Sequence, residues 1–371
     1  MGIFSKIFGS KQEKETQKHQ GFHNLTVSGV HKLTDDSVKI SFELSDDIKS
    51  NFDFVAGQYL TIIKTIDGEE LRRSYSICSA PNEQLSIAVK KVTYGKFSNW
   101  ALTDLNQGDE LLVSEPQGNF KLDSNARFIV SFVAGSGITP ILSMVKKLEN
   151  EVADFRLFYG NKTSNSVMFK SELANLRNTK TTFAYSQEKV DGELQGRLTK
   201  EKITEIIKSD LNLLKADAYY MCGPEELILN AKTVLEMFGV NKDKIHFELF
   251  TTPVLMKQEN TEAKEIYSGR TEVTVILDQE KIEFDYNAKD KTILEALNDK
   301  GFDPPYSCRG GVCCACRAKV LEGDMLMLMN YSLTDEEVKE GYVLTCQSHP
   351  TTEKIVLSYD CLLYTSDAVD E

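Results

Sequence analysis

The stretch "SCRGGVCCACRAK", residues 307–319, is the most informative part of the sequence because it concentrates side chains that bind metals. It holds four of the chain's eight cysteines, namely Cys308, Cys313, Cys314 and Cys316. Eight cysteines in 371 residues, most of them near one end, do not resemble the dense framework of a disulfide-bonded secreted protein. The stretch therefore predicts a metal or redox centre in a reducing compartment.

Three of these cysteines, together with a more distant one, have the spacing of a 2Fe–2S cluster. The pattern C-x4-C-x2-C, with 29 residues before the fourth cysteine, is the plant-type ferredoxin spacing. Two irons need two thiolates each, so the predicted ligands are Cys308, Cys313, Cys316 and Cys346. Cys314 is expected to direct its side chain away from the cluster. The alternative is a structural zinc site with four cysteines, but such sites favour two close-spaced pairs.

The charge and hydropathy of the chain exclude some classes of function. The net charge is -13 and the pI is near 5.1, so a nucleic acid backbone would be repelled. No apolar run approaches the roughly 18 to 20 residues that span a bilayer, so no transmembrane segment is expected. Residues 1–22 show no secretory signal and are predicted to be a flexible polar tail rather than a membrane-surface anchor. The expected location is the cytoplasm.

The pattern of strands and helices predicts three domains. Residues 23–122 read as short alternating strands separated by Asp, Asn and Gly turns, which indicates an antiparallel β-barrel. Residues 123–252 alternate buried strands with helices, which indicates an α/β doubly wound parallel sheet. Residues 253–267 lack periodicity and are interpreted as a linker. Residues 268–360 open with a β-β-α pattern that fits the α+β (β-grasp) fold of ferredoxins.

Two local features of the third domain and its end are informative. Thr292 and Glu295 have the spacing of a capping box, so a helix is expected to begin there and to stop at Gly301. The last residues, 361–371, read "CLLYTSDAVDE" and continue no domain pattern. That string resembles the translated product of a sequencing-library adapter, so these residues are interpreted as a non-natural tail and carry no functional inference.

The first domain carries two segments that resemble the flavin-binding signature of the ferredoxin–NADP reductase superfamily. They are "RRSYS", residues 72–76, and "GKFSNW", residues 95–100. In this chemistry an Arg neutralises a pyrophosphate, a Tyr packs on the flavin and a Ser hydroxyl bonds a ring nitrogen. A helix N-terminus can hold the same pyrophosphate. The resemblance implies that FAD is bound by Arg73, Tyr75, Ser76, Val89, Lys90, Gly95, Lys96, Phe97 and Ser98.

The second domain resembles the nicotinamide-binding half of the same superfamily. The segments are "AGSGITPI", residues 134–141, and "MCGPEE", residues 221–226. Their glycines let a strand turn into a helix while the phosphates of the coenzyme approach the backbone. Pro140 stands where a full G-x-G-x-x-G fingerprint has its third Gly. The resemblance implies that the coenzyme is bound by Gly135, Gly137, Thr139, Cys222 and Gly223.

The resemblance also implies three catalytic residues, Ser76, Cys222 and Glu248. In the superfamily a Cys at the position of Cys222 lies near the nicotinamide; the alternative is a small buried strand residue. The segment "HFELF", residues 246–250, resembles the one whose Glu and aromatic residue close over the flavin. Here those residues are Glu248 and Phe250. The alternative for this pair is an edge-strand residue and a core Phe.

The choice of coenzyme depends on a loop after the second strand of the nicotinamide domain. An NAD site usually has an acid about 20 residues after its glycine loop, but the strand "FRLFYG" ends without one. The residues that follow can instead bind a 2′-phosphate: Lys162, Thr163, Ser164 and Ser166. Gln187 stands where the family commonly has an Arg for that phosphate. We therefore expect NADPH over NADH, with Lys162 as the main discriminator.

Over residues 23–360 the chain resembles reductases built in the order flavin domain, nicotinamide domain, ferredoxin domain. Such a reductase converts one hydride into two single electrons, and a di-iron oxygenase is the implied acceptor. The segment from Cys316 to Pro350 resembles the members that serve phenylacetyl-CoA epoxidation. Two alternatives remain: a reductase for an alkane, ketosteroid or fatty-acyl hydroxylase, and a zinc- and nucleotide-binding protein without enzyme activity.

Overall fold

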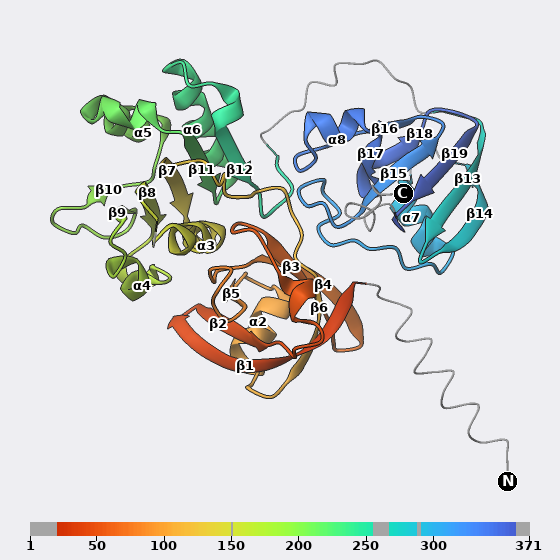
Figure 1. Ribbon diagram of the computed structural model, residues 1–371, viewed down its shortest axis with the longest axis horizontal. Coiled ribbons are helices and arrows are strands. Elements are labelled where there is room, and N and C mark those ends of the chain that lie inside the picture. Colours follow the sequence, from red (N-terminus) through yellow and green to blue (C-terminus); the bar gives the residue numbers. More distant parts are fainter. Residues whose placement is uncertain (1–20, 150, 255–266, 288–290, 361–371) are drawn as a thin grey trace, which may run out of the picture. The chain divides into compact units, whose positions relative to one another are not determined.

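The computed structural model describes four segments of the chain, residues 21–149, 151–254, 267–287 and 291–360. These residues form two compact units, the first within residues 23–257 and the second made mainly of residues from 267 onward. Figure 1 labels their elements. The predicted tail at the N-terminus, most of the predicted linker and the segment 361–371 lie outside the described residues. Among the described helices, none has both the length and the hydropathy that a membrane span requires.

The first unit begins with the antiparallel barrel that the alternating pattern predicts. Its strands are β1 (Phe22–Thr34), β2 (Ser37–Glu43), β3 (Tyr59–Ile66), β4 (Glu69–Ser76), β5 (Ser86–Lys90) and β6 (Glu110–Ser114). They run in the order β4-β3-β6-β1-β2-β5. A bridge between Ile77 and Ile87 joins the two ends of this sheet and closes it. Apolar side chains that alternate along the strands, such as Ile40 and Ile62, fill the interior.

Short helices interrupt the barrel. The 3-10 helix η1 (Lys49–Phe52) precedes β3, and the α-helix α2 (Lys96–Thr103) lies between β5 and β6. The α2 helix begins directly after Gly95 and buries Phe97 and Ala101 on one face. This apolar face anchors the helix on the barrel core, where it packs on β5, β2 and β3.

The remainder of the first unit is a six-stranded parallel sheet, which confirms the doubly wound prediction. Its strands are β7 (Phe128–Ala134), β8 (Asp154–Asn161), β9 (Thr179–Tyr185), β10 (Leu194–Gln195), β11 (Ala218–Cys222) and β12 (Ile245–Glu248). Their order is β10-β9-β8-β7-β11-β12. The chain moves outward from β7 to β10 and then returns to the other side of β7. The carboxyl ends of β7 and β11 therefore form the switch point where ligands bind in such sheets.

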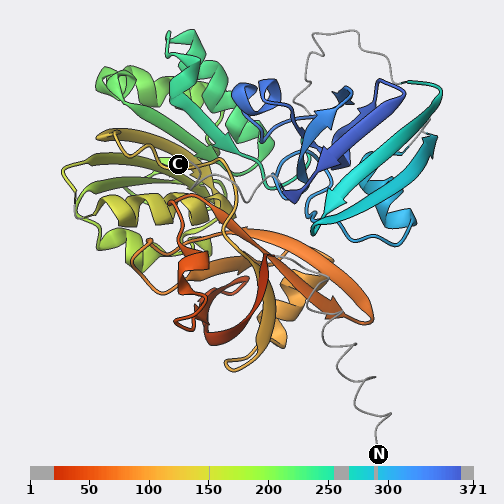
Figure 2. The ribbon, with the colours of Figure 1, turned by 45° about the vertical axis from the view of Figure 1, so that its right-hand side comes forward.

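Helices connect these strands and cover both faces of the sheet (Figure 2). The α-helices are α3 (Ile138–Leu148), α4 (Lys170–Ala174), α5 (Lys200–Ser209) and α6 (Glu225–Met237). The 3-10 helices are η2 (Gly135–Gly137), η3 (Ser164–Ser166), η4 (Leu211–Lys215) and η5 (Lys242–Lys244). The α3 helix is buried along most of its length because it packs on β7 and β11. Its first turn therefore starts at the switch point.

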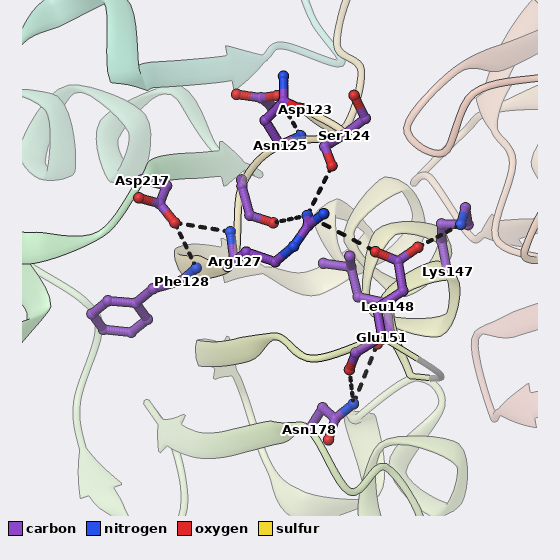
Figure 3. Close-up of polar contacts among 11 residues, drawn as sticks. Asp123, Ser124, Asn125, Arg127, Phe128, Lys147, Leu148, Glu151, Asn178 and Asp217 are labelled. Atoms are coloured by element: carbon purple, nitrogen blue, oxygen red, sulfur yellow. Dashed lines mark hydrogen bonds and ion pairs between the residues drawn. The ribbon is translucent and has the colours of Figure 1, made fainter.

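Polar contacts join the amino ends of the strands (Figure 3). The Asp217 carboxylate accepts the backbone N–H groups of Arg127 and Phe128, each at 2.8 Å, which links the start of β11 to the start of β7. These two donors lower the pKa of Asp217 below its usual value. Asn178, before β9, donates to the backbone carbonyl of Glu151 at 2.9 Å, before β8. The amino edge is thus fixed by structural contacts, and the carboxyl edge carries the glycine turns.

The second unit is a mixed sheet with a helix packed on it, as expected for a β-grasp domain. Its strands are β13 (Arg270–Leu277), β14 (Glu280–Asn287), β15 (Arg317–Glu322), β17 (Tyr342–Leu344) and β19 (Lys354–Ser358), in the order β14-β13-β19-β15-β17. Two short strands, β16 (Met325–Met327) and β18 (Ser348–Pro350), form a separate pair. The helices are α7 (Ile293–Asp299), α8 (Asp335–Lys339) and the 3-10 helix η6 (Thr345–Gln347).

The start of α7 confirms the predicted capping box. The Thr292 hydroxyl accepts the Glu295 backbone N–H, and the Glu295 carboxylate accepts the Thr292 backbone N–H. The backbone turns at Gly301, which has a φ of 84°. Ile293 and Leu297 then face the sheet and are fully buried. This helix leads directly into the cysteine loop and so fixes where that loop begins.

Candidate functional site

The cysteine loop brings the four predicted cluster ligands together in two pairs. The Cys313 thiol donates to the Cys308 sulfur at 3.0 Å. A second thiol contact joins Cys316 to Cys346, which lies in η6, and its hydrogen bond lowers the pKa of Cys346. Paired sulfurs match a binuclear centre, in which each iron takes two thiolates.

The surroundings of these sulfurs fit a 2Fe–2S cluster. Backbone N–H groups point at the sulfurs, as in the contact from Gly310 to Cys308 at 3.3 Å. Gly311 has a φ of 72°, and a Cβ there would lie 2.8 Å from the Met329 carbonyl oxygen. Glycine is therefore required for the loop to wrap closely.

Cys314 is oriented differently from its neighbours. Its thiol donates to the carbonyl oxygen of Ser332 at 3.5 Å and lies half-buried against a small apolar cluster. Burial raises the pKa of this thiol to about 11. The hydrogen bond turns the Cys314 thiol toward Ser332, whereas the four predicted ligands pair with one another. This contact supports the proposal that Cys314 is not a cluster ligand.

The barrel brings together part of the predicted flavin site. Tyr75 on β4 and Phe97 on α2 are in ring contact, with centroids 5.5 Å apart. Arg73 is exposed, and its guanidinium donates to the Arg72 carbonyl oxygen at 2.7 Å. The ammonium group of Lys96 forms an ion pair with Glu69. Arg73 thus remains at the barrel surface, whereas the charge of Lys96 is already compensated.

Three further residues of the expected flavin set have other surroundings. The side chain of Val89 is fully buried in the barrel core, so it could meet a ligand only through its backbone. Lys90 forms an ion pair with Asp36 at 3.3 Å and lines a cavity of the nicotinamide domain. The Ser98 hydroxyl accepts the Val92 N–H at 3.0 Å and so helps to form the loop before α2.

The three predicted catalytic residues meet at the ends of their strands. Ser76 ends β4, Cys222 ends β11 and Glu248 ends β12. The Ser76 hydroxyl donates to the Glu248 carboxylate at 3.0 Å, and Cys222 pairs with Glu248 in the register of β11 and β12. Burial raises the pKa of Glu248 to about 8, an effect that the Ser76 hydrogen bond partly offsets. Burial, with Glu248 nearby, also raises the pKa of the Cys222 thiol.

A cavity of about 600 Å³ opens at the carboxyl ends of β7, β8, β9 and β11. Six predicted cofactor residues line it, namely Lys90, Gly135, Lys162, Ser166, Gly223 and Phe250. Its position at the switch point and its glycine-lined wall fit a dinucleotide. Gly137, Thr139 and Cys222 are next to this cavity in the chain but do not line it.

Gly137 has a different role from Gly135. A Cβ at Gly137 would lie 2.2 Å from the carbonyl oxygen of Cys222, so this glycine lets the start of α3 approach the end of β11. Thr139 is buried and donates to the Ser136 carbonyl oxygen at 3.0 Å, which stabilises the same turn. These two residues therefore stabilise the turn beside the cavity without lining the cavity themselves.

The loop predicted to bind a 2′-phosphate is already engaged in internal hydrogen bonds. The Ser166 hydroxyl accepts the Thr163 N–H at 3.0 Å, and the Ser164 hydroxyl donates to Glu188 at 3.2 Å. In the part of the chain that the structure describes, the Lys162 ammonium has no ion-pair partner. Lys162 is therefore the member of this set that is ready to bind an anion.

Several residues that line the cavity were missed in the sequence. They are Asp36 in the β1–β2 turn, Arg197 after β10, and Glu226 and Asn230 on α6. Arg197 approaches Glu226 at 3.8 Å, and both side chains are exposed. The location of Arg197 just after a strand of the parallel sheet is the one signal that could have identified it. Asp36 could not have been found, because it comes from the barrel domain.

Three family models match the chain in the order of its domains. They are an oxidoreductase FAD-binding domain over residues 24–122, an oxidoreductase NAD-binding domain over residues 132–233, and a 2Fe-2S iron-sulfur cluster binding domain over residues 275–351. The chain therefore contains the domains that bind FAD, a pyridine nucleotide and a 2Fe–2S cluster.

Similar proteins share this organisation. A 1,2-phenylacetyl-CoA epoxidase component of Escherichia coli (strain K12) is 38% identical over 353 residues, 91% of this chain and 98% of that protein. The 3-ketosteroid-9-alpha-monooxygenase ferredoxin reductase component of Rhodococcus rhodochrous is 30% identical, over 90% of this chain and 96% of that protein.

Among solved structures, phthalate dioxygenase reductase has a TM-score of 0.57 at 25% identity and covers 94% of this chain and 99% of its own. It is described as a modular structure for electron transfer from pyridine nucleotides to a 2Fe–2S cluster. The chain belongs to this family of oxygenase reductases and is an NAD(P)H-dependent flavin and iron–sulfur oxidoreductase.

Proposed function

We propose that this protein carries electrons from NADPH to a di-iron oxygenase that epoxidises phenylacetyl-CoA. The observation that carries the proposal is the 38% identity to the 1,2-phenylacetyl-CoA epoxidase component over nearly the whole of both chains. When bound, FAD accepts the electron pair of a hydride and the 2Fe–2S cluster passes electrons on singly. The chain's own residues have to bind, orient and shield these groups.

The proposed roles follow from the contacts of each residue. The Ser76 hydroxyl, at the end of β4, is oriented by its bond to Glu248 and would bond a ring nitrogen of the flavin. Cys222, buried at the end of β11, has a raised pKa and would keep a neutral thiol near the nicotinamide. Glu248, with a pKa of about 8, is mainly protonated at neutral pH. The site thus presents neutral polar groups where hydride transfer occurs.

The coenzyme and the cluster are assigned to particular side chains in the same proposal. Lys162, exposed at the cavity, binds the 2′-phosphate of NADPH. Arg73, exposed on β4, would neutralise the FAD pyrophosphate. The four sulfurs that meet in two pairs, those of Cys308, Cys313, Cys316 and Cys346, hold the cluster.

The partner is proposed from charge as well as from similarity. Residues 270–360 carry 10 Lys and Arg against 17 Asp and Glu, so the domain that donates electrons is acidic. An acidic surface around an electron donor suits a basic patch on the acceptor. A cytoplasmic location completes the proposal, since reduced thiols and coenzyme are available there.

Reconstitution with candidate oxygenases tests this function. The purified protein, with NADPH and the oxygenase components of a phenylacetyl-CoA epoxidase, should yield epoxide at a rate limited by the oxygenase. The matched comparison is a 3-ketosteroid 9α-hydroxylase oxygenase, chosen because its reductase is 30% identical to this chain. Faster turnover with the steroid enzyme would reassign the partner. A colourless protein that contains zinc would contradict the reductase function altogether.

A further inference from the structure

Two loops run side by side at one rim of the coenzyme cavity. The first follows β8 and contains Lys162, and the second follows β9 and contains Ser186 and Gln187. The Ser186 N–H donates to the Asn161 carbonyl oxygen at 3.0 Å, and the Gln187 N–H donates to the Lys162 carbonyl oxygen at 2.9 Å. Both Lys162 and Ser186 line the cavity. Glu188, which follows Gln187 in the second loop, therefore lies next to the loop that contains Lys162.

The Glu188 carboxylate occupies the donors of the first loop. One oxygen accepts the Ser164 backbone N–H at 2.5 Å, and the other accepts the Ser164 hydroxyl at 3.2 Å. These bonds lower the pKa of Glu188, so the group is ionised at neutral pH. An N–H and a hydroxyl two residues from Lys162 are the groups that would otherwise bind a phosphate. The Glu188 carboxylate already accepts the hydrogen bonds of both groups.

We propose that Glu188 is a coenzyme-selectivity residue that weakens binding of a 2′-phosphate at the Lys162 loop and leaves binding of a 2′-hydroxyl unaffected. The inference rests on the proposed NAD(P)H reductase function and deepens it. Lys162 attracts the phosphate, whereas Glu188 repels it and withholds the Ser164 donors. The coenzyme preference of the protein is then a balance between two opposite charges on neighbouring loops.

The test compares substitutions that differ in charge and position. Glu188→Gln removes the charge and should raise kcat/KM for NADPH about five-fold, because one unit of repulsion at the rim is lost. The same variant should change kcat/KM for NADH by less than about two-fold. Glu188→Ala also frees the Ser164 donors and should raise the NADPH value at least as far. Asp191→Asn is the matched control, because Asp191 lies exposed in the same segment and its substitution removes the same charge.

Binding of two mononucleotides measures the same site without turnover. By titration calorimetry, 2′-AMP should bind more tightly to Glu188→Gln than to the parent protein, and 5′-AMP should bind equally to both. Selectivity that is unchanged in both Glu188 variants, or that changes as much in Asp191→Asn, would overturn the inference. A parent protein that prefers NADH would contradict the NADPH assignment alone, since the Glu188 effect is a change relative to the parent. Failure of both coenzymes to reduce the flavin would contradict the proposed function, and the 2′-AMP titration would still decide the role of Glu188.

Discussion

Ser76 and Glu248 are joined by a hydrogen bond of 3.0 Å although 172 positions separate them in the chain. The bond links the end of β4 in the barrel to the end of β12 in the parallel sheet. It brings a hydroxyl and a carboxyl with a raised pKa to the place where the two cofactor-binding domains of the first unit meet. The site is therefore assembled by tertiary structure rather than by one motif.

Substitution of Glu248 should alter the pH dependence of flavin reduction. The pKa of about 8 predicts that stopped-flow reduction of the parent holoenzyme changes between about pH 7 and 9 as the carboxyl ionises. Glu248→Gln should give a flat profile in that range. Ser76→Ala should shift the inflection upward, because the Ser76 hydrogen bond lowers this pKa. An inflection that persists unchanged in Glu248→Gln would assign it to another group.

The same carboxyl predicts a pH-dependent difference in stability. Its pKa in the folded protein exceeds its ordinary value of 4.5, so the folded state holds the proton more tightly. The stability that this proton confers is present below about pH 4.5 and is lost as the pH rises through about 8. The Tm of Glu248→Gln relative to the parent should therefore be higher at pH 9 than at pH 5. Equal Tm differences at the two pH values would contradict burial as the cause.

Arg73→Ala should weaken FAD retention by on the order of ten-fold, since a charge-assisted contact to a phosphate is lost. FAD content after dialysis and the dissociation constant from fluorescence titration measure the effect. Lys96→Ala is the matched control and should cost less, because Glu69 already compensates the Lys96 charge. Equal losses in both variants would mean that Arg73 has no special role.

Local sequence patterns predicted those parts of the fold that depend on neighbouring residues. The capping box of Thr292 and Glu295 spans four residues, so the start of α7 could be predicted. The glycine turn after β7 could be predicted for the same reason. The three-residue strand β17 has no alternation long enough to detect, so it was missed. Patterns within a short stretch of sequence do not show which distant segments pair in the fold.

In the candidate site, too, the features that depend on local spacing could be predicted, and those that depend on contacts between distant segments could not. Cysteine spacing identified the four sulfurs that meet in pairs, because spacing within a loop constrains geometry directly. The pair of Lys90 with Asp36 and the pair of Ser164 with Glu188 each join two separate elements, and the sequence predicts neither. Both change a prediction: Lys90 lines the coenzyme cavity, and the Ser164 donors are already engaged.

Gly137→Ala should impair the coenzyme site, because the added Cβ would lie 2.2 Å from the Cys222 carbonyl oxygen. Overpacking of this kind costs about 1–3 kcal/mol and should displace the end of β11. The KM for NADPH should rise and the Tm should fall. Gly192→Asn is the control, since its surroundings are open and Asn tolerates a positive φ. A normal KM in Gly137→Ala would show that this close approach is dispensable.

Electron delivery to the oxygenase should slow as salt is added, because screening removes the attraction between an acidic donor domain and its partner. Reduction of a small uncharged dye by the same protein should stay constant and serves as the control. Rates to the oxygenase that are flat from low to high ionic strength would rule out electrostatic docking.

We propose that four sulfurs in two pairs hold the cluster through which electrons leave the protein. The most direct measurement is electron paramagnetic resonance of the holoenzyme after anaerobic reduction with NADPH, in parallel with cytochrome c and dye reduction. Cys313→Ser and Cys346→Ser should lose the cluster signal and cytochrome c reduction but still reduce the dye through the flavin. Cys314→Ser should keep the signal and the iron content, because its thiol is bonded to the Ser332 carbonyl. Loss of iron in Cys314→Ser as complete as in Cys313→Ser would contradict the account.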